Sequence, residues 1–190
     1  MTEGPLIVGI GGSTGPASVT NRLLRLCLDE TEALGARTQE VVGADLAGLT
    51  IFNAENGPDP DAQPLLDAVR AADALIIATP GYHGSMSGLV KNALDHLELL
   101  RGDARPYLEG RAVGVIVSAA GWQACGTALM SVRSTIHALR GWPTPFGVTV
   151  NSAEQIGPDG FDERVLGGLR ILAGQLVQFA TWQAAARANA

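Results

Sequence analysis

The hydrophobic positions of the chain follow two kinds of pattern that alternate. Short runs that are apolar at every position, such as Ala74–Ala78, are typical of strands covered on both faces of a parallel sheet. Longer segments, such as 89–100, repeat their apolar residues every three or four positions and predict helices. The two patterns alternate five times. The sequence therefore predicts an α/β fold with a parallel sheet.

The run Ala74–Ala78 is the predicted central strand, whereas polar residues in the second strand suit a sheet edge. Five strands favour the flavodoxin-like order 2-1-3-4-5, a three-layer sandwich with helices on both faces of a five-stranded parallel sheet. Predicted strands cover 5–10, 36–42, 74–78, 111–117 and 146–150, and predicted helices cover 19–34, 64–72, 89–100, 127–139 and 162 to the end of the chain.

A binding loop is predicted after the central strand. Pro80 cannot continue a hydrogen-bonded ladder, and Gly81 and Gly84 permit unusual backbone angles, so the loop is expected to keep its amides available. Ser85 or Ser87 is expected to cap the helix that follows. Ligands bind at the carboxyl ends of the strands in such sheets. The loops after the first, third and fourth strands are the ones rich in glycine and hydroxyl groups.

Length, composition and charge favour a single domain over residues 1–190. The chain is 46% hydrophobic and 17% charged, which fits one well-buried core. A net charge of −6 without runs of lysine or arginine predicts no nucleic-acid and no membrane partner. The start of the chain lacks a signal-peptide pattern, and no apolar run reaches ~18 residues. A cytoplasmic protein is expected.

The cysteines and histidines predict no metal site. Cys27 and Cys125 lie in apolar helical patterns, where a buried thiol is the common state. His83, His96 and His137 share no ligand spacing with cysteines or carboxylates.

The loop after the first strand predicts a phosphate cradle over residues 13–20. It leads into a helix N-terminus, whose amides and positive dipole end favour phosphate. An ordinary capped turn is the alternative. No lysine follows a glycine in this loop, which excludes a Walker-type loop, and Thr14 stands where the dinucleotide fingerprint needs a small glycine.

The same loop also matches the nucleophile elbow G-x-S-x-G, over Gly11–Gly15, with Ser13 as the nucleophile. A serine hydrolase is therefore an alternative enzyme class. Such an elbow normally follows several strands, whereas eight residues precede Gly9. His96 and His137 also lie inside helical patterns, which disfavours the hydrolase.

Two motifs resemble those of the NADPH-dependent FMN reductases, a family of flavodoxin-like fold. The family's phosphate loop G-S-x-R-x-x-S is similar to residues 12–18, GSTGPAS. Its second motif, P-x-Y-x-x-x-x-S/P-G-x-L-K-N-A-[IL]-D, is similar to residues 80–95, PGYHGSMSGLVKNALD. The resemblance covers roughly residues 5–151. It implies an oxidoreductase that transfers hydride from NADPH, or NADH, to FMN, without a catalytic side chain of its own.

The resemblance also implies where the cofactor binds. The first loop would hold the FMN phosphate, the loop after the third strand would pass along the flavin ring, and the loop after the fourth strand would border it. The implied cofactor-binding residues are Ser13, Gly15, Ser18, Thr20, Pro80, Gly81, Tyr82, His83, Gly84, Ser85, Ser118 and Gly121.

The chain departs from the family pattern at three of these positions. Gly15 stands where the family usually has arginine, and Gly81 and His83 replace the frequent glutamate and asparagine. Loss of the arginine removes a charged phosphate fork, so FMN is expected to be held less tightly unless another arginine substitutes. A loosely held flavin suits release of reduced FMN to a partner. Ser87 is more similar to reductases that serve two-component monooxygenases than to the quinone and azo reductases.

A non-catalytic electron carrier of the flavodoxin kind is the other alternative, although flavodoxins lack the GLVKNALDHL helix found here. The segment 88–100 is apolar on more than one side, and we expect one side to meet a second subunit in a homodimer or homotetramer. The acceptor is left open between flavin itself, a partner oxygenase and a small molecule such as a quinone.

Overall fold

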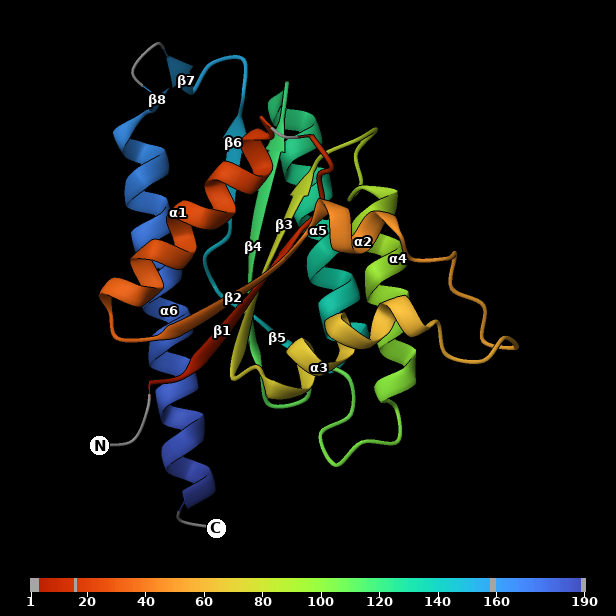
Figure 1. Cartoon of the computed structure of the whole chain (residues 1–190). Helices are drawn as coiled ribbons and strands as arrows, with labels where there is room; N and C mark the ends of the chain where they lie inside the picture. The colour runs from red at the N-terminus through yellow and green to blue at the C-terminus, as the bar shows by residue number, and fades with distance from the viewer. Residues whose placement is uncertain (1–3, 16, 158–159, 189–190) are drawn as a thin grey trace.

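The computed structural model describes residues 4–15, 17–157 and 160–188, and a parallel sheet forms its centre (Figure 1). The strand order is β2-β1-β3-β4-β5, with β6 also paired to β4, and every pair in this sheet is parallel. The predicted flavodoxin-like order is confirmed. The strands are β1 (Leu6–Gly11), β2 (Arg37–Val42), β3 (Ala74–Pro80), β4 (Ala112–Ala119), β5 (Trp142–Pro143) and β6 (Val148–Asn151).

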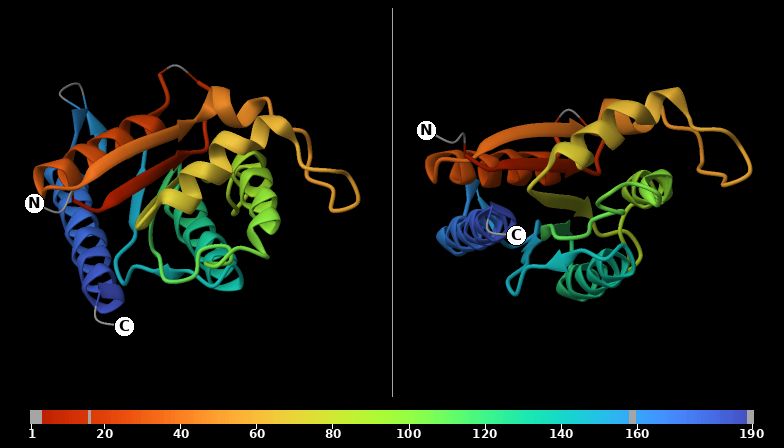
Figure 2. Two further views of the ribbon diagram at one scale, coloured as in Figure 1. Left: turned by 60° about the horizontal axis from the view of Figure 1, so that its bottom comes forward. Right: turned by 90° about the horizontal axis from the view of Figure 1, so that it is seen from below.

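Helices cover both faces of the sheet (Figures 1 and 2). On one face α1 and α6 pack over a core that includes Ile7, Ile76 and Leu172. On the other face α2 to α5 pack over a core that includes Val8 and Ile77. The helices are α1 (Val19–Ala33), α2 (Gly43–Ala47), α3 (Gln63–Ala71), α4 (Gly88–His96), α5 (Trp122–Ala138) and α6 (Glu163–Ala188), with 3-10 turns η1 (Pro60–Ala62) and η2 (Leu97–Leu100) and a hairpin of β7 (Ile156–Gly157) and β8 (Gly160–Phe161).

Every residue of β3 is buried, as its apolar pattern predicts. The expectation that Pro80 ends the ladder is wrong, because the strand includes Pro80 in register with Ser118. Proline lacks a donor, but the next amide, that of Gly81, donates to the Ser118 carbonyl at 2.8 Å. Pairing with β4 therefore continues past the proline.

The fifth strand position is filled in two pieces. The sequence predicts a strand at 146–150, whereas β6 covers Val148–Asn151 and the short β5 precedes it. Pro145 and Gly147 interrupt the region between them. The amide of Thr144 donates to the Val113 carbonyl at 3.0 Å, which keeps the chain beside β4 across this interruption.

Two helices also differ from the predicted bounds. The helix expected at 127–139 begins earlier, at Trp122. Gly126 lies near its start, and glycine is ordinarily unfavourable inside a helix, so the sequence pattern did not predict the first residues of α5. The helix expected at 89–100 ends as α4 at His96 and continues as η2. Pro16 of the predicted phosphate loop lies outside the described residues. No helix in the described part of the chain has both the length and the hydrophobicity needed to cross a membrane.

Candidate functional site

The loops after β1, β3 and β4 emerge at the same end of the sheet, opposite the end where the two termini lie (Figure 1). Backbone hydrogen bonds join them. The Gly12 amide donates to the Ala78 carbonyl of β3, and the Gly81 amide donates to Ser118 of β4, both at 2.8 Å. The three predicted binding loops are therefore neighbours.

Gly12 in the first loop and Gly43 at the start of α2 have no room for a side chain. A Cβ on Gly12 would lie 2.2 Å from the Val90 side chain and 3.2 Å from the Ala78 carbonyl oxygen. A Cβ on Gly43, at the start of α2, would lie 2.3 Å from the Ser13 carbonyl oxygen. The loop is thus packed closely between α4 and α2, which fixes its path.

The first loop ends in a capped helix with free donors before it. Ser18 caps α1 and accepts a hydrogen bond from the Asn21 amide at 3.2 Å, while the Asn21 side chain donates to the Ser13 carbonyl at 2.9 Å. The backbone amides of Ser13, Thr14 and Gly15 donate to no described residue. Open amides beside a helix N-terminus fit an anionic group such as phosphate.

Position 15, a glycine where the family that the sequence resembles usually has arginine, has open space around it. Among the described residues other than its chain neighbours, a Cβ there would have only the Ser13 hydroxyl, at 3.8 Å, within 4 Å. Arg22, in the first turn of α1, is the nearest arginine in the sequence, and its guanidinium lies 4.9 Å from the centre of the Phe161 ring. A Cβ can therefore be added at position 15 without a clash.

Thr20 and Ser118 face one another. Their hydroxyl oxygens lie 2.7 Å apart, and both residues are buried. Sequence reasoning placed the two hydroxyls near different parts of the cofactor, but each one here has the other as its hydrogen-bond partner. The pair joins the start of α1 to the end of β4.

Ser87 connects the first loop to the loop after β3. Its hydroxyl donates to the Gly12 carbonyl at 3.0 Å and accepts from the Val90 amide at 3.3 Å, so it also caps α4. Its own amide donates to the Thr79 hydroxyl at 2.9 Å. Of the two serines predicted as the cap, Ser87 takes that role.

The loop after β3 folds into a tight turn. Tyr82 and Ser85 exchange two backbone hydrogen bonds of 3.0 Å, and the residues between them, His83 and Gly84, have φ of 52° and 83°. Positive φ at both central positions is typical of a type I′ turn. The amides of Gly81, Tyr82 and Ser85 are therefore used internally, whereas those of His83 and Gly84 donate to no described residue.

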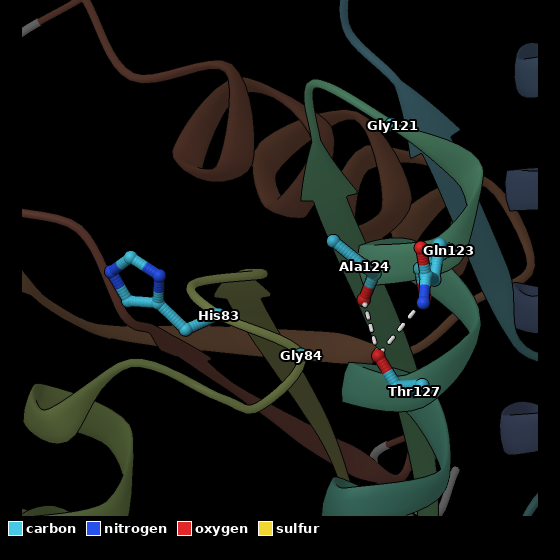
Figure 3. A pocket seen from close by; sticks show the side chains of 6 residues that line it. All are labelled: His83, Gly84, Gly121, Gln123, Ala124 and Thr127. Atoms are coloured by element: carbon cyan, nitrogen blue, oxygen red, sulfur yellow. Dashed lines mark hydrogen bonds between the residues drawn. The ribbon is translucent and has the colours of Figure 1, made fainter.

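A cavity of about 610 Å³ lies between this turn and the start of α5. This volume is within the usual range for small-molecule sites. Figure 3 shows the imidazole of His83 turned away from α5, while the Thr127 hydroxyl bonds to carbonyls of its own helix. The cavity is lined by His83, Gly84, Gly121, Gln123, Ala124 and Thr127.

Close packing explains the glycine at position 81. A Cβ there would lie 3.1 Å from that of Ala119 and 3.3 Å from the Ala124 carbonyl oxygen. A glutamate, frequent at this position in the family that the sequence resembles, would force these neighbours to move. The absence of a side chain at position 81 lets the loop lie against α5.

Trp122 is a residue of this edge that the sequence reasoning did not single out. Its side chain is about half exposed, and its indole N–H donates to Glu154 at 2.9 Å, while Glu154 accepts from the Asn151 side chain at 2.8 Å. The position of tryptophan directly after Gly121, the residue that caps α5, was the available signal. Gln123 and Ala124 were missed because α5 was expected to begin later, and Thr127 because it was interpreted only as the first residue of that helix.

The predicted site residues fall into distinct environments. His83, Gly84 and Gly121 line the cavity, whereas the remaining ones lie on the adjoining loops, in the first turn of α1 or within β3 and β4. Tyr82 is 60% exposed, and the Ser85 hydroxyl lies 3.1 Å from that of Ser131. Those outside the cavity lining are Ser13, Gly15, Ser18, Thr20, Pro80, Gly81, Tyr82, Ser85 and Ser118.

The described residues around these loops give little support to a serine hydrolase or a metal site. No described histidine hydrogen-bonds to Ser13, and His96 is buried against the Thr50 carbonyl at 3.0 Å, which disfavours the hydrolase alternative. Among residues 4–15, 17–157 and 160–188, no group of three His, Cys, Asp or Glu side chains could hold a metal ion. Burial raises the pKa of both thiols, that of Cys27 to about 12 and that of Cys125 above its ordinary value.

Comparisons with known proteins agree with this geometry. An NAD(P)H-dependent FMN reductase of Pseudomonas aeruginosa is 29% identical over 139 residues, which are 72% of this chain and 71% of that protein. An FMN-dependent NADPH-azoreductase of Staphylococcus aureus is 34% identical over 90 residues, 47% of this chain, and the match spans 44% of the azoreductase. The crystal structure of an oxidoreductase from Corynebacterium diphtheriae has the same fold, with a TM-score of 0.72 at 19% identity over 95% of this chain and 98% of that one.

The family model for NADPH-dependent FMN reductases matches residues 5–155, most of the chain. The match includes all three loops described above. The chain belongs to the NADPH-dependent FMN reductase family, and the expectation of an oxidoreductase that uses FMN and NAD(P)H is confirmed.

Proposed function

We propose that the chain is a single FMN-binding domain that brings NAD(P)H and FMN together across the loops after β1, β3 and β4. The cavity of about 610 Å³ between the 82–85 turn and α5, beside a first loop with open amides, carries this proposal. FMN supplies the capacity to accept hydride from NAD(P)H and to reduce an acceptor. The protein's contribution is to position the two rings and to exclude water, so no catalytic side chain is assigned.

The residues fit the two ends of FMN. The open amides of Ser13 and Gly15, the hydroxyl of Ser18 and the dipole of α1 would hold the phosphate. The amides of His83 and Gly84 would face the polar edge of the ring. The remaining residues of the proposed site shape the loops around the cofactor: Thr20, Pro80, Gly81, Tyr82, Ser85, Ser118 and Gly121.

How firmly the protein holds FMN determines which electron acceptor it can serve. Gly15 provides no charged fork, which supports exchange of FMN and delivery of reduced flavin to a monooxygenase partner. Direct reduction of a quinone or an azo compound is the second route, favoured by the similarity to the staphylococcal azoreductase. Turnover with each acceptor, in the presence and absence of added FMN, distinguishes the two.

The assembly that we propose is a cytoplasmic homodimer or homotetramer. A hollow of about 390 Å³ separates α4 from α5 and includes Leu94 and Leu139 among its lining residues. Val90, Ala93 and Leu94 of α4 are already buried within the chain, so a second subunit seated on this side would contact mainly the polar residues that line the hollow, such as Lys91 and Asp95. Sedimentation that gives only monomer would exclude this assembly.

Steady-state consumption of NADPH with free FMN tests the proposed function. We expect turnover that requires FMN and shows saturation with both substrates. Protein that binds flavin but consumes no NADPH would instead be a flavodoxin-type electron carrier. Protein that never binds flavin would contradict both.

A further inference from the structure

A group of arginines lies at the opposite end of the sheet from the proposed flavin site. The loop 101–111 connects η2 to β4 at the end where the termini lie (Figure 1). Together with Arg70 from α3, it surrounds a hollow of about 370 Å³. The hollow is lined by Arg70, Asp103, Ala104, Arg105 and Arg111.

Arg111 is a buried charge without an acidic partner. Its side chain is 1% exposed, and its guanidinium donates to carbonyl oxygens of Arg70, Ala72 and Tyr107 at 3.0 to 3.2 Å. No carboxylate of the described chain forms a salt bridge with it. Buried charges are normally paired, because desolvation is costly. Burial, and next the charge of Arg105, lowers the pKa of Arg111 to about 10, so it remains a cation at neutral pH.

Arg105 brings a second unmatched charge to the same place. Its Nη1 donates to the Ala72 carbonyl at 3.4 Å, the same oxygen that accepts from Arg111. Its Nη2 is buried and donates to no described residue. A buried N–H without an acceptor destabilises the fold unless a ligand or water accepts from it.

The neighbouring carboxylates are already engaged elsewhere. Asp103 accepts from Arg70 at 2.9 Å, and Asp73 accepts from the Leu6 amide at 3.0 Å and lies 3.8 Å from Arg187. Asp73 and Asp103 offset only part of the positive charge at this place, because burial and the neighbouring arginines still lower the pKa of both Arg105 and Arg111. An anion between the two guanidinium groups would offset the repulsion between them.

We propose that this hollow binds a phosphate group, either inorganic phosphate or the phosphate of a small monoester, between Arg105 and Arg111. The unpartnered Nη2 of Arg105 supplies N–H donors for a phosphate oxygen, whereas Arg111, whose nitrogens already donate to four carbonyls, contributes mainly its positive charge. The site lies away from the loops that would hold FMN, so its occupation does not depend on the proposed function.

Isothermal titration of FMN-saturated protein with inorganic phosphate tests the site, because bound FMN keeps the flavin phosphate position filled. Glycerol 3-phosphate, in a parallel titration, distinguishes a monoester from free phosphate. We expect saturable one-to-one binding of at least one of the two. Arg105→Gln should weaken it about tenfold or more, as loss of a charge-assisted hydrogen bond predicts.

Arg101→Gln is the matched control, since the Arg101 side chain is 77% exposed in the same region and does not line the hollow. It should leave binding unchanged. Absence of saturable binding of both ligands up to about 10 mM would overturn the proposal. Equal binding by the Arg105→Gln variant and wild type would overturn it as well.

Discussion

The buried hydroxyls of Thr20 and Ser118 lie 2.7 Å apart and link the start of α1 to the end of β4. The pair connects α1, which follows the first loop, with β4, which precedes the loop at Gly121. Their hydrogen bond thus helps to fix the distance between the first loop, which we assign to the phosphate, and the loop after β4, which would border the ring. A structural role for this pair is separable from a direct role in binding.

Thr20→Val tests this pairing. The change keeps the shape of the side chain but leaves the Ser118 hydroxyl unpaired, so the free energy of unfolding should fall by about 1–3 kcal/mol in urea denaturation. The double variant with Ser118→Ala should lose less than the sum of the single losses, because one interaction is removed in both. Unchanged stability together with an FMN Kd more than about tenfold higher would instead show that the hydroxyl contacts the cofactor.

Gly15→Arg restores the arginine that the family usually carries. The position is open, so the substitution should leave stability nearly unchanged. A charged fork near the phosphate should lower the Kd for FMN about tenfold, measured by quenching of flavin fluorescence. The gain should shrink at high ionic strength. Gly15→Gln, which lacks the charge, is the control, and equal gains in both variants would contradict an electrostatic cause.

Ser87→Ala removes the hydrogen bond to the Gly12 carbonyl and the cap of α4. The free energy of unfolding should fall by about 1–2 kcal/mol, and FMN should bind more weakly because the first loop loses its anchor. Ser85→Ala is the stability control, since its hydroxyl is exposed, and its effect should stay within about 0.5 kcal/mol. Equal losses in the two variants would argue against the anchoring role of Ser87.

The buried thiol of Cys27 should lower the free energy of unfolding at alkaline pH. Burial, and next the negative charge of Glu30, raises the pKa of its thiol from 9.0 to about 12. The Cys27 thiol loses its proton at a lower pH in the unfolded chain than in the folded one. The contribution of the protonated thiol to the free energy of unfolding is therefore full below pH 9.0 and is lost as pH rises toward about 12. The free energy of unfolding should therefore fall more steeply over this range in wild type than in Cys27→Ala.

Alkylation followed by mass spectrometry gives a second readout at neutral pH. Cys27 and Cys125 are both buried and should react with iodoacetamide only when urea unfolds the protein. Rapid labelling of native protein at Cys27 would contradict the buried, protonated thiol.

The sequence allowed the fold and the position of the site to be predicted because both depend on strong local signals. Continuous burial of the run 74–78 identified the central strand, and helical spacing identified α4. The direction in which a hydroxyl points cannot be predicted from such local patterns. Thr20 and Ser118 are 98 residues apart, and their pairing depends on how α1 packs on the sheet. The early start of α5 was not predicted because Gly126, a residue type unfavourable inside a helix, lies near its beginning.

Close packing and long-range polar contacts could not be predicted from the sequence either. The sequence gives no sign that a Cβ at position 81 would crowd the side chain of Ala119, because only the fold brings the two positions together. The bond from Trp122 to Glu154 joins residues 32 positions apart. The burial of Arg111 contradicts the ordinary tendency of arginine to lie at the surface.

The most direct test of the account is an absorbance titration of the purified protein with FMN in the absence of oxygen, followed by NADPH and, in a separate sample, NADH. The account predicts a saturable shift of the flavin bands on binding and their bleaching when reduced nicotinamide is added. Flavin bands that do not change with protein, or bound flavin that neither nucleotide bleaches, would contradict it.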